Sequence, residues 1–169
     1  MIREATVDDK FRLVEMTTRF IVSTRYHEWL GGTTPDRIGA LVDRVLEHGV
    51  IFVAETDTPC MLEKDDGDGY VDDNDVCISC AELVGMLALI VFEHPLTGRP
   101  TAEEAAWWVE PEHRHGSVGP RLMAHMEGWC VQKRLHMVKM VAPDGSSVGD
   151  FYKKRGYQAV ETHWVRVFD

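Results

Sequence analysis

The chain lacks any long uncharged apolar run. None of its hydrophobic stretches approaches the roughly 18 to 20 residues that a membrane helix requires, so we expect no membrane span. The opening residues, MIREATVDDKFRLVE, lack the apolar core of a secretory signal, so we expect a cytoplasmic protein. Four cysteines in 169 residues do not resemble a disulfide scaffold, and we expect them to be free thiols.

The chain also lacks an excess of positive charge. Its 28 acidic and 18 basic residues give a formal net charge of −10, so nucleic acid is not expected as a ligand. Eight acidic residues and one Lys lie between positions 57 and 76, in a segment with too few apolar residues to form a packed core. We predict a single domain over residues 1–169 with an acidic, cysteine-containing insertion at about 57–81.

Short apolar runs alternate with helix start signals along the rest of the chain. Strands are predicted over 2–5, 50–55, 82–92, 101–109, 136–142 and 157–168, the last closing the sheet. Helices are predicted over 6–24, 34–48, from 119 onward, and over 149–155. The buried stripe of the first helix is expected at Phe11, Val14, Thr17 and Ile21. This order predicts a mixed α/β sheet with helices on both faces.

A loop of small residues separates the strand 101–109 from the helix that follows it. Its backbone amides would point at one spot with the helix dipole behind them, which favours anion binding. Gly116 and Gly119 allow a pyrophosphate to approach the backbone, and Arg114 and Arg121 can add charge-assisted bonds. A plain tight turn is the alternative, because the loop matches neither the Walker pattern nor the full dinucleotide fingerprint.

Three runs together resemble the GNAT family of acetyl-CoA-dependent N-acetyltransferases, particularly small phage and bacterial members. They are WWVEPEHRHGSVGPRLM, the upstream EHPLTG and the downstream FYKKRGYQAVETHWVR, and the opening IREATVDD matches the family's first strand and helix start. The family's pyrophosphate loop, Q/R-x-x-G-x-G/A, falls on Arg114, His115, Gly116, Ser117, Val118 and Gly119. Ser117 stands where the family usually has glycine, with Gly116 beside it. The resemblance implies the GNAT fold, a mostly antiparallel twisted sheet, and acetyl-CoA as the cofactor.

The strand before the loop carries two neighbouring carboxylates, Glu103 and Glu104. An amine of pKa about 10.4 must lose a proton before it attacks a thioester, so a nearby carboxylate base is required. The resemblance assigns this role to Glu104. Because successive strand residues face opposite ways, a bulge would exchange the two, and Glu103 stays a second candidate. A solvated strand edge is the alternative for both.

The resemblance assigns two further groups. Tyr152, four residues before Gly156, matches the tyrosine that usually serves the family as general acid toward the leaving thiolate. A packing role is the alternative. Gly145 stands where the family often has a cofactor-binding asparagine. Backbone groups of Trp108 and Val109 are expected to hydrogen-bond the pantetheine arm of the cofactor.

The sequence contains only incomplete patterns of metal ligands. Cys77 and Cys80 have zinc-ligand spacing with Cys60 upstream, but a second C-x-x-C pair is missing. Residues 64–75 follow a calcium-loop register only in part, with Lys64 at the first ligand position. We expect no metal.

The sequence therefore predicts an acyltransferase that moves an acetyl or short acyl group from acetyl-CoA to a primary amine by direct attack. The acceptor, a small molecule or a peptide, is not identified, and a homodimer is left open. A rival reading is an inactive GNAT-fold module that binds coenzyme A or docks a basic protein through the acidic insertion. A third is a metal sensor built on that insertion.

Overall fold

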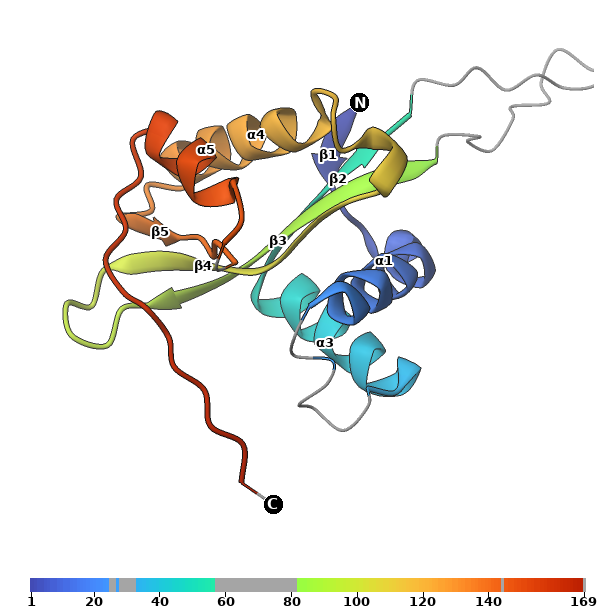
Figure 1. Cartoon of the computed structure of the whole chain (residues 1–169), viewed down its shortest axis with the longest axis horizontal. Coiled ribbons are helices and arrows are strands. Elements are labelled where there is room, and N and C mark those ends of the chain that lie inside the picture. The colour runs from blue at the N-terminus through green and yellow to red at the C-terminus, as the bar shows by residue number, and fades with distance from the viewer. Residues whose placement is uncertain (25–26, 28–32, 57–81, 144, 169) are drawn as a thin grey trace, which may run out of the picture.

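The computed structural model describes residues 1–24, 27, 33–56, 82–143 and 145–168 (Figure 1). A five-stranded sheet runs through its centre in the order β1-β2-β3-β4-β5. The pairs β1–β2, β2–β3 and β3–β4 are antiparallel, and the pair β4–β5 is parallel. Their bounds are Ile2–Glu4, Gly49–Glu55, Leu83–Glu93, Pro100–Val109 and Met137–Lys139. The predicted mixed, mostly antiparallel sheet is confirmed.

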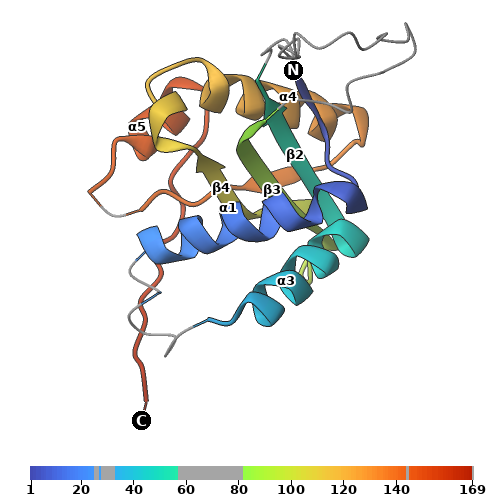
Figure 2. The ribbon, with the colours of Figure 1, turned by 90° about the vertical axis from the view of Figure 1, so that its right-hand side faces the viewer.

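Helices cover both faces of this sheet, as predicted (Figure 2). On one face lie α1, Lys10–Ser23, and α3, Pro35–His48; on the other lie α4, Val118–Gln132, and α5, Val148–Lys154. The strand side chains alternate between two apolar cores, one under each helix pair. Phe52 and Leu87 are fully buried beneath α4, while Val53 and Met86 are buried beneath α1 and α3. Both faces of the long apolar strands are therefore covered.

The first helix starts where the sequence predicts, and its buried face overlaps the predicted stripe only in part. The Thr6 amide donates to the Asp9 carboxylate at 2.8 Å, and one 3-10 turn, Val7–Asp9, leads into α1. The buried residues of α1 are Leu13, Met16 and Thr17, whereas Phe11 is 78% exposed. The predicted stripe was wrong at Phe11, because more than one stripe on this helix keeps helical spacing and only packing against the sheet selects one.

The segment 157–168 does not form the predicted closing strand. No residue from Gln158 to Phe168 pairs with a strand in the described part of the chain. Gly156, at φ +90°, ends α5 and redirects the backbone, and the segment then runs past β5 and away from the sheet (Figure 1). The strand propensity of the sequence is therefore not matched by a partner within the fold.

Residues 57–81, which hold the predicted insertion and three of the four cysteines, lie outside the described residues. The chain leaves the sheet at Thr56 and re-enters it at Glu82, and the Thr56 amide donates to the Glu82 carbonyl at 2.9 Å. The fourth thiol, Cys130, is buried on α4 as predicted, and burial raises its pKa to about 11. Within the described ranges, no helix is both long and apolar enough to span a bilayer.

Candidate active site

The strands β4 and β5 separate partway along their length. They pair at only three positions, from Thr101 with Met137 to Glu103 with Lys139. Beyond Glu103, β4 continues to Val109 with no strand on that side among the described residues. The amide of Glu110 donates to the Val84 carbonyl on β3, so by alternation the backbone groups of Trp107 and Val109 face the open edge. The backbone groups of Trp108, which the sequence analysis expected at the cofactor, face β3 instead. A fork therefore opens beside the second half of β4.

A bulge in β4 decides which carboxylate faces this fork. Ala88 of β3 pairs with Ala106, but the next residue, Leu89, pairs with Glu104, which leaves Ala105 as an extra residue. Ala105 and Ala106 both pack against the core under α1 and α3. Glu104 consequently lies on the same face as Trp107, toward α5.

Glu104 is held by two hydrogen bonds at the mouth of the fork. Its Oε2 atom accepts from the backbone N–H of Val141 at 3.0 Å and from the hydroxyl of Tyr152 at 3.2 Å. The Tyr152 hydroxyl also lies 3.2 Å from the carbonyl oxygen of Val141. Two residues 48 positions apart, predicted separately from the sequence, therefore meet at one point.

The electrostatics of this pair follow from its burial. Burial raises the pKa of Glu104 to about 6, although the bonds from Val141 and Tyr152 oppose the rise. Burial, and then the neighbouring Glu104 carboxylate, raise the pKa of Tyr152 well above its ordinary value. The tyrosine is thus a protonated hydrogen-bond donor near neutral pH, and Glu104 is a carboxylate that exchanges a proton near neutrality.

Glu103 is placed differently. It is exposed, and its carboxylate lies 4.0 Å from the Lys139 ammonium on the neighbouring strand. Tyr152 makes no hydrogen bond to it in the described part of the molecule. Of the two sequence candidates, only Glu104 is joined to the tyrosine.

The aromatic side chains behind the pair form one cluster. The rings of Trp107 and Tyr152 are stacked with centroids 6.0 Å apart, and Phe151 and Tyr157 lie against Tyr152 at 6.1 and 5.4 Å. The Tyr152 side chain is buried. These contacts hold the Tyr152 ring in place. Tyr152 therefore has the packing role considered above and also donates a hydrogen bond to Glu104.

The loop after β4 presents unbonded amides. A 3-10 turn, Pro111–His113, leads through Arg114 to the start of α4. Within the described residues no acceptor lies in hydrogen-bonding geometry to the backbone N–H groups of Ser117, Val118 and Gly119. Ser117 is exposed, and the other two are partly exposed. Free N–H groups at the start of a 15-residue helix favour an anion.

The remaining predicted residues line this loop in different ways. Arg114 donates from Nε to the Val109 carbonyl at 2.9 Å, and its guanidinium lies 4.3 Å from the centre of the Trp108 ring. His115, Gly116 and Arg121 are exposed around the loop. Arg114 is therefore tied to the end of β4 in this structure, and its contact with a diphosphate stays a prediction.

One ion pair next to the loop was missed by the sequence analysis. Glu110, which directly follows β4, is buried, and its carboxylate accepts from Arg19 of α1 at 2.6 Å with Arg12 at 3.9 Å. No spacing rule links residues 91 positions apart, so the sequence carried no local signal for it. The pair fastens α1 to the strand that carries Glu104.

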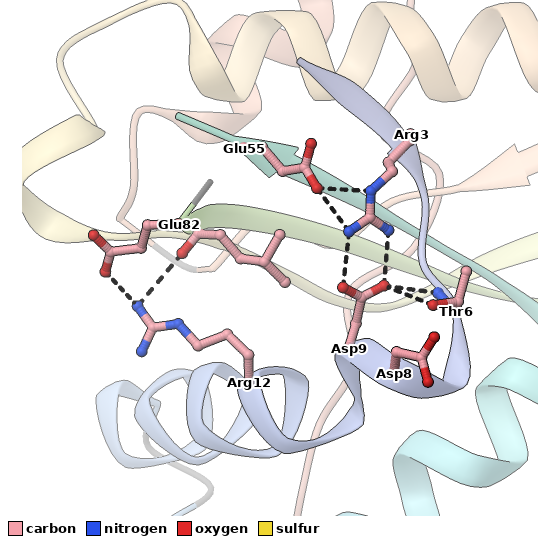
Figure 3. A pocket seen from close by; sticks show the side chains of 8 residues that line it. Arg3, Thr6, Asp8, Asp9, Arg12, Glu55 and Glu82 are labelled. Atoms are coloured by element: carbon pink, nitrogen blue, oxygen red, sulfur yellow. Dashed lines mark hydrogen bonds and ion pairs between the residues drawn. The ribbon is translucent and has the colours of Figure 1, made fainter. Parts of the chain in front are cut away.

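A separate hollow of about 550 Å³ contains none of the predicted site residues (Figure 3). Five of its six charged side chains bind one another: Arg3 contacts Asp9 at 2.8 Å and Glu55 at 2.7 Å, and Arg12 contacts Glu82 at 2.8 Å. The hollow is lined by Arg3, Thr6, Asp8, Asp9, Arg12, Glu55, Glu82 and Leu83. Because these charges are paired, we assign the hollow a structural role.

We searched the described residues for side chains that could bind a metal ion together. No group of three or more His, Cys, Asp or Glu side chains there is arranged to hold an ion. The zinc and calcium patterns fall on residues 60–80, outside the described ranges, and so does the acidic surface of the rival binding module.

Comparisons with known proteins identify the family. Residues 27–157 match the acetyltransferase (GNAT) family, so the chain belongs to that family. No curated protein matches the sequence. Members of the GNAT family are acyltransferases, and they generally use acetyl-CoA.

Solved structures share the fold at low sequence identity. A ribosomal-protein-alanine N-acetyltransferase from Brucella melitensis biovar Abortus 2308 has a TM-score of 0.68 and 14% identity, over 99% of each chain. A glucosamine-6-phosphate N-acetyltransferase from Arabidopsis thaliana has a TM-score of 0.66 and 15% identity, over 100% of this chain and 98% of that one. An aminoglycoside acetyltransferase from an uncultured soil metagenomic sample has a TM-score of 0.66 and 17% identity, over 100% and 96%. At these identities the likeness concerns the fold.

Proposed function

We propose that this protein transfers an acetyl or other short acyl group from acetyl-CoA to a primary amine, with Glu104 as general base and Tyr152 as general acid. The observation that carries the proposal is the Glu104–Tyr152 pair at the mouth of the β4–β5 fork, beside a loop with unbonded amides. The single domain over 1–169 and a cytoplasmic location belong to the same proposal.

The residues around the fork fit acetyl-CoA. The amides of Ser117, Val118 and Gly119 would hold its diphosphate, with Arg121 nearby. Gly119 lies against β4: a Cβ atom there would be in ordinary van der Waals contact with the Trp107 ring at 3.4 Å and Val109 at 3.8 Å. The outward backbone groups of Trp107 and the amide of Val109 would bind the extended arm as an added strand, while the Val109 carbonyl accepts from Arg114. Bound in this way, acetyl-CoA would supply an activated acyl thioester.

The protein's own contribution is proton transfer and position. Glu104, with a pKa of about 6, is ionised at neutral pH and accepts, directly or through water, the proton that the acceptor ammonium must lose before the free amine attacks the thioester. Tyr152 donates a proton to the departing thiolate. A backbone amide at the end of β4 would stabilise the developing oxyanion.

The proposed acceptor is an amine of the kind that proteins sharing the fold acetylate. The solved structures that share the fold are described as acting on a ribosomal protein alanine, an amino sugar phosphate and an aminoglycoside. These acceptors have an amino group in common and little else. We therefore propose a primary amine and leave the size of the acceptor to experiment.

Two measurements test the function. Acetyl-CoA binding should raise the melting temperature by linkage, and the shift should grow with concentration. Turnover should then appear with at least one member of a panel of amines that includes amino sugars, polyamines and N-terminal peptides. The absence of any shift at millimolar acetyl-CoA would contradict the proposal, and binding without turnover on any amine would favour the inactive module instead.

A further inference from the structure

Arg114 occupies one of the backbone groups that β4 presents at the open edge of the fork. These groups are the N–H and the C=O of Trp107 and of Val109, and no strand pairs with them in the described part of the chain. The Nε atom of Arg114 donates to the Val109 carbonyl at 2.9 Å. An extended ligand that paired along the whole edge would meet an acceptor that is already bonded.

The contacts that hold Arg114 in this position are few. Its guanidinium lies 4.3 Å from the centre of the Trp108 ring, and the residue is exposed. Apart from these two contacts, no hydrogen bond or ion pair joins the Arg114 side chain to another described residue. A bond to a neutral carbonyl and a ring contact open to water are both modest interactions. Arg114 can therefore exchange this position for a stronger partner.

The guanidinium lies on the side of β4 away from the amide loop. The Trp108 side chain packs in the core under α1 and α3, whereas Gly119 lies against Trp107 on the face that α4 covers. Arg114 precedes Ser117 by only three residues, so its long side chain can reach either side of the strand. In this structure it is bonded on the Val109 side and leaves the loop amides open.

A diphosphate held by the loop would change this balance. Pairs between a guanidinium and a phosphate are charge-assisted and frequently bidentate, and they are about twice as strong as hydrogen bonds between neutral groups. The pantetheine arm of the donor carries two amides, and each amide N–H requires an acceptor such as the Val109 carbonyl when the arm lies along the edge as an added strand. The same diphosphate that attracts Arg114 therefore frees an acceptor for the arm.

We infer that Arg114 determines which thioester donors the protein accepts, because it withholds the Val109 carbonyl from donors that lack a diphosphate. A donor with a diphosphate draws the guanidinium away, and an N–H of its arm takes the freed carbonyl. A donor without one has to break the contacts of Arg114 and provides no replacement for them. This inference rests on the proposed function, since it concerns the choice of acyl donor, and it makes Arg114 a specificity residue for binding.

Two donors that share one arm test the inference. Acetyl-CoA and S-acetylpantetheine, which lacks the diphosphate, are titrated calorimetrically into the wild type and Arg114→Met. Methionine keeps an unbranched stem beside Trp108 but has no charge and no donor. The variant should bind acetyl-CoA about 10-fold or more weakly, because a charge-assisted contact is lost. It should bind acetylpantetheine about 3- to 10-fold more tightly, because the carbonyl is free.

Arg121→Met is the matched control. Arg121 is an exposed arginine beside the same loop, and its side chain makes no hydrogen bond to Val109. Its replacement removes the same charge without freeing the carbonyl, so it should weaken acetyl-CoA binding and leave the affinity for acetylpantetheine unchanged. The opposite signs of the two effects are therefore expected only at Arg114.

Inorganic pyrophosphate gives a second measurement on the unmodified chain. At millimolar concentration it should tighten the binding of acetylpantetheine to the wild type about 3- to 10-fold, because it draws Arg114 from the carbonyl. The same addition should have no such effect on Arg114→Met.

The outcomes separate this inference from the proposed function. Suppose that acetyl-CoA binds the wild type but acetylpantetheine binds Arg114→Met no more tightly. The arm then shares the carbonyl with Arg114 or does not reach it, and the inference is wrong while the function stands. Pyrophosphate that leaves the binding of acetylpantetheine to the wild type unchanged also overturns the inference. A wild type that does not bind acetyl-CoA contradicts both.

Discussion

The hydroxyl of Tyr152 lies 3.2 Å from Oε2 of Glu104, so the two proposed proton-transfer groups are directly hydrogen-bonded. The contact couples their titrations, because the carboxylate charge raises the pKa of the phenol. When Glu104 takes a proton from the amine, that charge disappears and Tyr152 becomes the stronger acid. The geometry therefore favours donation to the leaving group after the amine has been deprotonated, and Glu104 can return a proton to Tyr152 afterwards.

Replacing Glu104 by Gln should lower kcat by about 10² to 10⁴-fold, since a positioned base contributes on this order. Acetyl-CoA affinity, measured by thermal shift or calorimetry, should change little, because the loop amides are untouched. Glu103→Gln is the matched control and should retain nearly full turnover, as Glu103 faces Lys139 at the surface. Equal loss of turnover and affinity in Glu104→Gln would reassign that residue to structure.

The acid side of the pH profile should report Glu104. Only the ionised carboxylate accepts a proton, so kcat/KM should fall as the pH drops through about 6 and level off above it, before the acceptor's own titration intervenes. Tyr152→Phe removes a bond that lowers the pKa of Glu104, so the midpoint of this limb should move to higher pH. Tyr152→Phe should also lower kcat by about 10 to 10³-fold while it keeps the ring stacked on Trp107. An unmoved midpoint would show that the hydrogen bond is not maintained in solution.

The amide loop can be tested by adding charge without weakening the helix. Ser117 is the N-cap of α4, where Asp is equally well tolerated and complements the helix dipole. Ser117→Asp should therefore leave the melting temperature without ligand equal or higher, yet abolish most of the acetyl-CoA shift, because the new carboxylate repels a diphosphate. Thr34→Asp, at the N-cap of α3 across the sheet, is the control and should keep the full shift. A normal shift in Ser117→Asp would place the diphosphate elsewhere.

Stability at low pH should depend on Asp9. Arg3 donates two bonds of 2.8 Å to this carboxylate and lowers its pKa, chiefly through that hydrogen bonding. A carboxylate with a lowered pKa stabilises the fold above its unfolded pKa of about 3.9, and the contribution is lost as the pH falls below that value. Asp9→Asn should lower the free energy of unfolding at neutral pH by about 2 kcal/mol and flatten its acid dependence. Denaturant titration measures both.

The exposed pair Lys10 with Asp43 supplies the comparison for that experiment. Both side chains are substantially exposed, so Asp43→Asn should change the stability by less than about 1 kcal/mol at any pH. A comparable loss in the two variants would mean that burial of the Asp9 contact contributes nothing.

Most of the fold was predictable because its signals are local. The N-caps at Thr6 and Thr34, the apolar run 82–92 and the glycine-bearing loop before α4 each act over a few residues, and the structure confirms the elements they predict. The wrong predictions concern contacts that local pattern does not define. Phe11 is the exposed member of a stripe in which Thr17 is buried, and the strand-like segment 157–168 pairs with no strand in the described fold.

The sequence by itself determined the family, the order of strands and helices, and a short list of site residues. It could do so because hydrophobic periodicity, helix capping and turn formation depend on residues that are close together in the sequence. Only the tertiary structure decided that Glu104 and not Glu103 meets Tyr152. That choice depends on one extra residue, Ala105, inserted in the pairing of β4 with β3, and no local pattern in the sequence marks the position of this bulge. It likewise decided that Glu110 binds Arg19, since folding alone brings residues so distant in sequence into contact.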